Sequence, residues 1–342
     1  MAILYISIFL LFYSIFTNNE ENNFDRFVIA GVFLFLVVSK VFVNIWSLPD
    51  LDNYYWGYKE LSNVDWKDIV NHDFAALKCP EIGFRYILKI GSWLGDFKWS
   101  LLIVAIVNTF AYVNLAKKYS PYIMVSLIIF LLGSVQSFFV LRQHLAIAIT
   151  IFSYAYIINR DWKKFCLLMF LAFSFHQTAL VFIPVYFIYG IKSTRNLNIV
   201  LVVLFAFIFI SFTLLLNKFA VSLHGYESYI DSNESNITTL LISACYLFTY
   251  VFFLKENVYV QGFERLLFIL LAFNFMMLLS GYTFTGINRL LMYYSVANIL
   301  TVPITMTYIE RFPIKYAYCA FVLLMLTYMF YNGSNAEYIE MI

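Results

Sequence analysis

Residues 121–141 read PYIMVSLIIFLLGSVQSFFVL and residues 143–159 read QHLAIAITIFSYAYIIN, so that only Arg142 separates two apolar runs. As a helix, each run is long enough to approach or exceed the thickness of a hydrocarbon core of about 30 Å. Helices are the expected form because an open sheet edge leaves unsatisfied backbone groups in lipid. The stretch therefore predicts two membrane-spanning helices joined tightly, with Arg142 at their junction.

The whole chain shares the apolar character of this stretch. Of its 342 residues, 63% are hydrophobic and 12% are charged, whereas a soluble domain carries about 25% charged residues. Further apolar runs of roughly spanning length lie near residues 1–17, 27–47, 98–116, 197–216, 237–254, 265–280, 290–309 and 316–332. We predict an all-α polytopic integral membrane protein with about 10–12 transmembrane or re-entrant helices, forming a single transmembrane domain over residues 1–342. The net charge of +2 predicts no nucleic-acid partner.

The run 165–190 is interrupted by polar residues, among them His176. It is either one tilted span or a re-entrant hairpin. If it is a hairpin, most Lys and Arg residues of the short loops share one side with residues 18–26, as cytoplasmic loops do. We favour the hairpin. Residues 48–97 then form an extracytoplasmic loop and residues 217–236 a second one, in a multi-pass protein.

The outer loop 48–97 opens with two carboxylates and an aromatic stretch, Asp50-x-Asp52-x-x-Tyr55. Carboxylates act as bases or bind hydroxyl groups, and aromatic rings pack on the faces of sugars. The alternative interpretation is a helix N-cap followed by an interfacial aromatic belt.

Residues 81–95 show apolar positions at helical spacing and predict an amphipathic helix on the outer membrane surface. Glu81 and Arg85 are four residues apart on this helix, so they are either substrate-binding groups or an ordinary surface ion pair.

Three further stretches place polar groups at the predicted outer side: Arg142-Gln143, His176, and Asn288-Arg289. A guanidinium near lipid is tolerated where it faces a watery cavity or an anion, and it matches phosphate oxygens bidentately. Arg142 at a helix end is otherwise explained by its side chain reaching back to the interface. Histidine side chains can take up a proton near neutral pH, and the alternative role of His176 is helix packing.

The four cysteines form no CxxC pair, and we predict neither a disulfide framework nor a zinc site.

Taken together, these motifs resemble the EpsG-like branch of the Wzy polysaccharide polymerases. The resemblance rests on Asp50-x-Asp52-x-x-Tyr55, Glu81-x-Gly83-Phe84, Arg142-Gln143-x-x-Ala146, Phe175-His176-Gln-Thr-Ala179-Leu180 and Asn288-Arg289. It covers chiefly residues 45–190, and the C-terminal half contributes mainly its hydropathy and the Arg289 loop.

The resemblance implies a GT-C-like glycosyltransferase in the bacterial inner membrane. Such an enzyme polymerises undecaprenyl-pyrophosphate-linked oligosaccharide repeats into O-antigen, capsular or exopolysaccharide at the outer face, without metal or cofactor. Its partners are the lipid-linked oligosaccharide and membrane lipid, with a chain-length regulator as a further candidate.

The chemistry of the residues agrees with these roles. Arg142 and Arg289 are candidates to stabilise the leaving pyrophosphate, and His176 is the first candidate base, with Asp50 or Asp52 as alternatives.

Three other functions are open at this point. A ligase would use the same donor with a different acceptor. A flippase or transporter of lipid-linked sugars would also contain broken helices and buried arginines, although the sequence shows no internal repeat. A membrane O-acyltransferase would use an intramembrane histidine but would not explain two outward arginines.

Overall fold

The structure is a computed structural model that describes residues 6–7, 9–10, 13, 23–73, 81–191, 240, 243–248, 250, 262–281 and 287–332. The predicted spans 1–17, 197–216 and 237–254 and the loop 217–236 lie wholly or mostly outside these residues. The chain divides into two compact units. The first comprises Met1–Ser153, Lys163–Leu180 and Leu323–Ile342, and the second comprises Tyr154–Trp162 and Val181–Val322.

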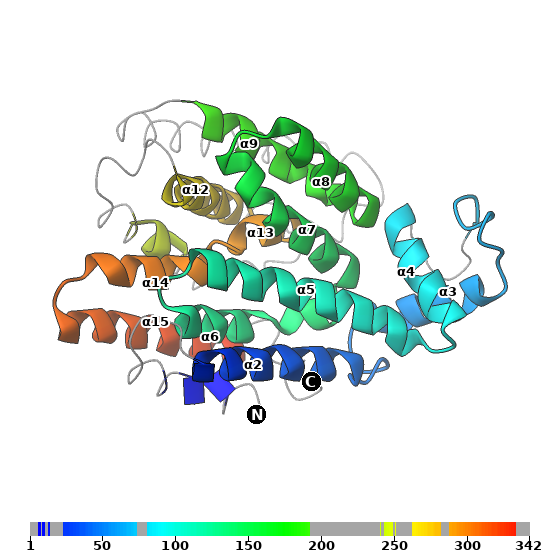
Figure 1. The fold of residues 1–342 in the computed structure, drawn as a ribbon, viewed down its shortest axis with the longest axis horizontal. Coiled ribbons are helices and arrows are strands. Elements are labelled where there is room, and N and C mark those ends of the chain that lie inside the picture. Colours follow the sequence, from blue (N-terminus) through cyan, green and yellow to red (C-terminus); the bar gives the residue numbers. More distant parts are fainter. Residues whose placement is uncertain are drawn as a thin grey trace. The chain divides into compact units, whose positions relative to one another are not determined.

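The described residues are helical and contain no strand, which confirms the predicted all-α fold (Figure 1). The α-helices are α2 (Asn23–Val41), α3 (Leu51–Ser62), α4 (Ile82–Trp93), α5 (Phe97–Tyr119), α6 (Ile123–Gly133), α7 (Leu141–Ile158), α8 (Trp162–Phe175), α9 (Ile183–Gly190), α12 (Phe263–Gly281), α13 (Ile287–Ser295), α14 (Asn298–Tyr308) and α15 (Phe312–Asn332). Two 3-10 helices, η1 (Val135–Phe138) and η2 (Gln177–Phe182), lie between them.

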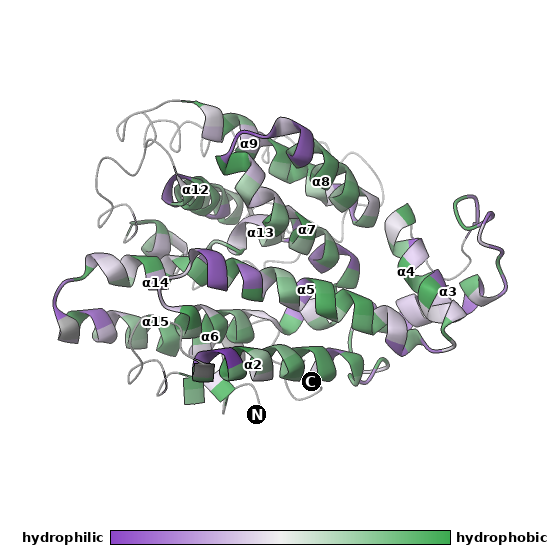
Figure 2. Ribbon diagram, in the orientation of Figure 1, coloured by the Kyte–Doolittle hydropathy of each residue, from purple (hydrophilic) through white to green (hydrophobic). Residues whose placement is uncertain are grey.

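Three described stretches are long and apolar enough to cross a membrane: Phe97–Tyr119, Leu141–Ile158 and Arg289–Tyr308. They match the spans predicted at 98–116, 143–159 and 290–309. Figure 2 shows the hydrophobic residues concentrated along helices such as α2, α5 and α7. Together with the shorter apolar helices, they give the chain the character of a polytopic membrane protein.

The predicted span 121–141 is wrong as a single helix. It forms α6, which ends at Gly133, and then η1. The hydroxyl of Ser134 donates to the carbonyl of Leu131 at 2.8 Å, and that of Ser137 donates to the carbonyl of Ser134. Such local bonds compete with helix propagation, and glycine lowers helix propensity further. Apolar composition alone therefore overestimated the length of this helix.

In the first unit, α2 packs beside α5, and α4 packs against both α3 and α5 (Figure 1). Phe84 and Leu88 of α4 are fully buried. The apolar face that predicted an interfacial helix therefore lies against protein. Lys40 of α2 is also buried, and its ammonium group donates to Asn108 of α5 at 2.7 Å.

The run 165–190 is broken at the predicted place. Helix α8 ends at Phe175, and the chain continues through His176 into η2 and then α9. Arg160, two residues before α8, donates to the backbone carbonyl of Tyr186 in α9, while the Tyr186 hydroxyl donates to the Arg160 carbonyl at 3.0 Å. The chain thus returns in α9 to the point from which α8 starts, as a hairpin does. On which side of the membrane this hairpin opens stays a prediction.

The second unit is organised around α12, which packs against α9, α13 and α14. Tyr294 of α13 is fully buried and stacks on Phe273 of α12, with ring centroids 4.9 Å apart. Its hydroxyl donates to the Val181 carbonyl at 2.5 Å. These contacts anchor the last turn of α13, while Asn288 and Arg289 lie at the start of the same helix.

Candidate functional site

Glu81 is the centre of a buried charged cluster in the first unit. Its Oε2 accepts a hydrogen bond from Nη1 of Arg142 at 2.7 Å, and its Oε1 lies 2.9 Å from Nδ1 of His176. The exposed fractions of the three side chains are 4% for Glu81, 20% for Arg142 and 14% for His176. Arg142 and His176, which are 61 and 95 positions away from Glu81 in the sequence, thus both contact its carboxylate.

Each of the three residues stands at the end of a helix. Glu81 is the N-cap residue of α4 and has extended backbone, Arg142 is the second residue of α7, and His176 follows the last residue of α8. A helix end projects a side chain beyond the cylinder of its helix, which lets three separate helices place their side chains at one point.

Gly83 permits the close approach of α4 to the end of α8. A Cβ atom at this position would lie 2.6 Å from Oγ and 2.8 Å from the backbone oxygen of Ser174. Only glycine leaves room for this contact. Because Gly83 is two residues after Glu81 and Ser174 is two residues before His176, the contact sets the distance between the carboxylate and the imidazole.

Glu81 remains ionised in the cluster. Burial raises the pKa of its carboxyl group, but the hydrogen bond to His176 and the charge of Arg142 outweigh burial and lower the pKa to about 2. An ionised carboxylate only accepts hydrogen bonds, so Nδ1 of His176 carries a hydrogen. In a neutral imidazole with this tautomer, the other ring nitrogen, Nε2, is the hydrogen-bond acceptor.

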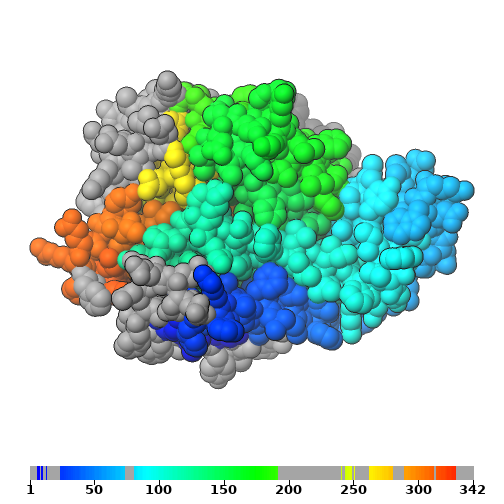
Figure 3. All heavy atoms as spheres, viewed as in Figure 1, coloured from blue at the N-terminus to red at the C-terminus, as the bar shows by residue number. Residues whose placement is uncertain are grey.

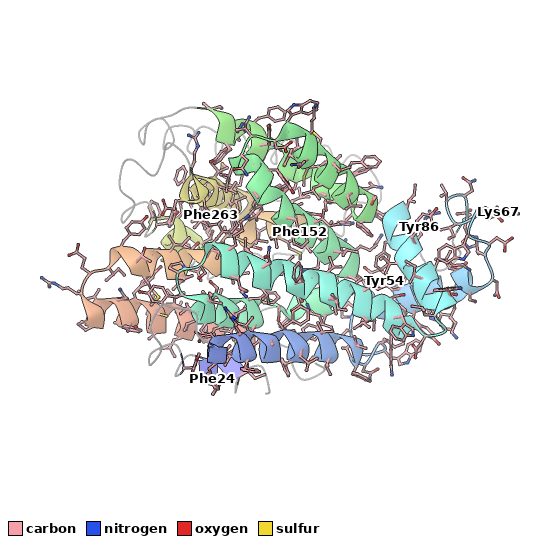
Figure 4. All side chains as sticks on the ribbon, in the orientation of Figure 1. Phe24, Tyr54, Lys67, Tyr86, Phe152 and Phe263 are labelled. Carbon is pink, nitrogen blue, oxygen red and sulfur yellow. The ribbon has the colours of Figure 1, made fainter. Side chains whose placement is uncertain are left out.

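Arg142 also contacts Tyr54 of α3. Its Nε atom lies 3.5 Å from the Tyr54 hydroxyl, and its guanidinium carbon lies 5.6 Å from the centre of the ring. Tyr54 is only 2% exposed and packs edge-on against Phe84 of α4 at 5.1 Å. Helices α3 and α4 therefore both hold the guanidinium in place. Figure 4 labels Tyr54 beside the first turns of α5.

The sequence did not single out Tyr54, although a signal for it exists. The buried residues of α3 include Leu51, Tyr54, Tyr58 and Leu61, which follow helical spacing. The predicted residue Tyr55 lies next to that face, where its ring contacts Trp46 and Phe97 with centroids 5.4 and 5.8 Å away. Reading the period of α3 first would have pointed to Tyr54.

The two predicted carboxylates of the outer loop lie apart from the cluster. Asp50 is the N-cap residue of α3 with a φ angle of 64°, and Oδ1 of Asp52 accepts from the backbone nitrogen of Asn53 at 2.8 Å. Within the described residues, no contact joins either of them to Glu81 or His176. Both residues stand at the start of α3, as the helix-start interpretation expects, but the Asp50 side chain makes no capping hydrogen bond.

Arg85 holds a loop. Its Nη1 donates to the backbone carbonyls of Ile69, Val70 and His72 at 3.1, 2.9 and 3.0 Å. Glu81, four residues before it, is buried and contacts Arg142 and His176, so the surface-pair interpretation of Glu81 does not hold.

The remaining predicted residues lie on α7 and α13. Gln143 is buried in α7 next to Arg142. Asn288 and Arg289 are the second and third residues of α13 in the second unit, and Arg289 is exposed. The convergence of Arg289 with Arg142 stays a prediction.

The all-helical, apolar fold defines a polytopic membrane protein, and it contains a buried carboxylate between an arginine and a histidine. In the comparison with protein families, the model of the EpsG family matches residues 26–341. The chain therefore belongs to the EpsG family and is a membrane protein of the polysaccharide-polymerase type. No curated protein and no solved structure matches it.

Proposed function

We propose that this protein is a glycosyltransferase of the GT-C kind that polymerises undecaprenyl-pyrophosphate-linked oligosaccharide repeats at the outer face of the bacterial inner membrane. The product would be an O-antigen, a capsular polysaccharide or an exopolysaccharide. The observation that supports this proposal best is the cluster at Glu81, because it holds a proton acceptor and a phosphate-binding group at one place in an otherwise apolar protein.

His176 is the proposed base. Glu81 fixes its Nδ1–H, so that Nε2 can take the proton from the acceptor sugar hydroxyl. The hydroxyl oxygen then forms a bond to the anomeric carbon of the donor sugar. The bond from that carbon to the pyrophosphate oxygen breaks, and its electron pair leaves with the lipid pyrophosphate. The imidazolium that forms lies beside the negative charge of Glu81.

Arg142 is the proposed partner of the leaving pyrophosphate. Fixed positive charge in a site that excludes water stabilises developing negative charge without reorganisation, and guanidinium groups match phosphate oxygens. Tyr54 and Glu81 orient Arg142 for this task. We assign Arg289 the same chemistry because it is the third residue of α13 and follows a polar stretch of sequence.

The test is polymerisation by the full-length protein, reconstituted in liposomes with undecaprenyl-pyrophosphate-linked repeats. We expect a ladder of lengthening glycans for the wild type. His176→Ala, Arg142→Ala and Arg289→Ala should each abolish the ladder or reduce it by about 100-fold or more. Arg311→Ala, which removes an exposed arginine just before α15, is the matched control and should keep it.

Other outcomes identify the other classes. An unchanged ladder with His176→Ala would remove the histidine from the mechanism. Movement of lipid-linked sugar across the bilayer without polymer would assign the protein to the transporters. A single transfer to a different acceptor would identify a ligase.

A further inference from the structure

The loop after α3 carries an aromatic pair outside the charged cluster. Trp66 in this loop and Tyr86 of α4 have nearly parallel rings, with 20° between their planes and centroids 6.4 Å apart. Despite this contact, Trp66 is 45% exposed and Tyr86 is 37% exposed. The two rings stack on each other, and the exposed part of each remains accessible to a ligand.

Two cations of α4 bond backbone carbonyls, Arg85 in this loop and Lys89 in the last turn of α3 before it. The Arg85 guanidinium bonds the carbonyls of Ile69, Val70 and His72, and the Lys89 ammonium donates to the carbonyl of Leu61 at 2.8 Å. Lys89 is buried and also lies 5.8 Å from the centre of the Trp66 ring. The aromatic pair is thus preorganised, which lowers the entropic cost of binding.

The loop residues next to Trp66 are mostly polar, whereas Val70 of the loop and Ile82, one turn before Tyr86 on α4, are exposed apolar neighbours. Exposed carboxylate, amide and ammonium groups flank Trp66 at Asn63, Asp65, Lys67, Asp68 and Asn71. Figure 4 labels Lys67 in this loop and Tyr86 on α4, and Figure 3 shows α3, the loop and α4 as one continuous surface.

A second set of exposed aromatic residues has a different setting. Phe42, Trp46 and Trp99 stand at the ends of the apolar helices α2 and α5, as expected of an interfacial belt. Trp66 has charged neighbours and does not stand at the end of an apolar helix, so it does not have the setting of an interfacial belt residue. A sugar ring, by contrast, presents apolar C–H faces to aromatic rings and hydroxyl groups to carboxylates and amides.

We propose that Trp66 and Tyr86 form a glycan-binding platform that holds a segment of the saccharide chain away from the reacting bond. This inference rests on the proposed function. Tyr86 is five residues after Glu81 on the same helix, a rise of roughly 7.5 Å, so a bound oligosaccharide can reach both places.

The experiment measures binding rather than catalysis. The probe is the lipid-free, size-fractionated polysaccharide that cells make only when they carry this protein, labelled with a fluorophore. Its affinity for full-length protein in nanodiscs is measured by fluorescence anisotropy. Trp66→Ala and Tyr86→Ala should each weaken binding by about tenfold, and Trp66→Phe should bind nearly as well as the wild type. Trp46→Ala is the control that should leave the affinity unchanged.

Each contrary result has a distinct meaning. If no polysaccharide depends on the protein, the proposed function fails and the platform with it. If the polysaccharide is made but Trp66→Ala and Tyr86→Ala, folded as judged by circular dichroism, bind it like the wild type, only the platform is overturned. Quenching by brominated lipid that is lost in Trp66→Phe would place the ring in the membrane interface and overturn it too.

Discussion

Glu81 joins α4 to the start of α7 and to the end of α8 through its two carboxylate oxygens. A carboxylate that is almost fully buried is tolerated only when it is paired and hydrogen-bonded, and here both oxygens have cationic or N–H partners. In the proposed mechanism the residue would act through His176 and Arg142, as a positioning residue.

This role predicts how Glu81 variants behave in the polymerisation assay. Glu81→Gln keeps the size but removes the charge that fixes Nδ1–H of His176 and balances the imidazolium. We expect its rate to fall by about 100-fold or more, with a smaller loss for Glu81→Asp. Equal rates for Glu81→Gln and the wild type across the pH range of activity would contradict the positioning role.

The depressed pKa of Glu81 also predicts the pH dependence of stability. Because the pKa falls from 4.5 to about 2 on folding, the ionised carboxylate contributes its full stabilisation above about pH 4.5 and loses it as the pH falls toward 2. Thermal unfolding of wild type and Glu81→Gln in detergent should therefore differ most above pH 4.5, and the difference should shrink on acidification. A difference that grows below pH 4.5 would be the contrary result.

Removing Arg142 tests the ion pair itself. Arg142→Ala leaves a buried carboxylate with His176 as its remaining partner in the cluster, and we expect a loss of about 3 kcal/mol in unfolding free energy. The double variant Glu81→Leu/Arg142→Leu removes both charges and should be more stable than Arg142→Ala, although inactive. Chemical denaturation of the two variants in the same detergent makes this comparison.

The position of α4 beside the end of α8 depends on Gly83. Gly83→Ala would place Cβ 2.6 Å from the Ser174 hydroxyl and 2.8 Å from its backbone oxygen, so α4 must move away from the end of α8. We expect this variant to lose most of its polymerisation activity while remaining inserted. Gly31→Ala in α2 is the matched control, since a Cβ there has no atom within 4 Å. Retained activity in Gly83→Ala would show that the spacing of the two helices is not critical.

The apolar runs predicted the bounds of several helices closely. Burial in lipid or in protein requires apolar residues along the whole length of a helix, so its ends are visible in the sequence. The expected span 98–116 is contained in α5, and 265–280 is contained in α12. The break after Gly133 was not predicted, since two serine hydroxyls bonded to local carbonyls decide it. The break at His176 was predicted, because a polar group in the middle of an apolar run is visible in the sequence.

The site, like the helices, could be predicted in part from the sequence. Arg142 and His176 were recognised because each is an ionisable residue in an apolar setting. Glu81 was named as a substrate-binding candidate within the motif Glu81-x-Gly83-Phe84, with a surface pair to Arg85 as the alternative, but its partners Arg142 and His176, 61 and 95 residues away, were not predicted. Long-range pairing of this kind leaves no periodic trace in one sequence.

The membrane topology of the whole molecule can be tested by the accessibility of single cysteines to a labelling reagent. The contact between Arg160 and Tyr186 brings the two ends of the run 162–190 together. Single cysteines introduced at Lys118 and Ser193, in a background without the native cysteines, should therefore react with a membrane-impermeant maleimide from the same side, the cytoplasmic one. Labelling of Ser193→Cys from outside, with Lys118→Cys protected, would show that the run crosses the membrane once.

The meeting of three helix ends at Glu81 also has an electrical consequence. Aligned peptide dipoles give a helix a partial positive charge at its N-terminus and a partial negative charge at its C-terminus. Glu81 stands at the positive end of α4, and His176 stands at the negative end of α8, where positive charge would develop during proton transfer. The positive end of α7, beside Arg142, would face the departing phosphate. The backbone itself thus adds to the field that the side chains create.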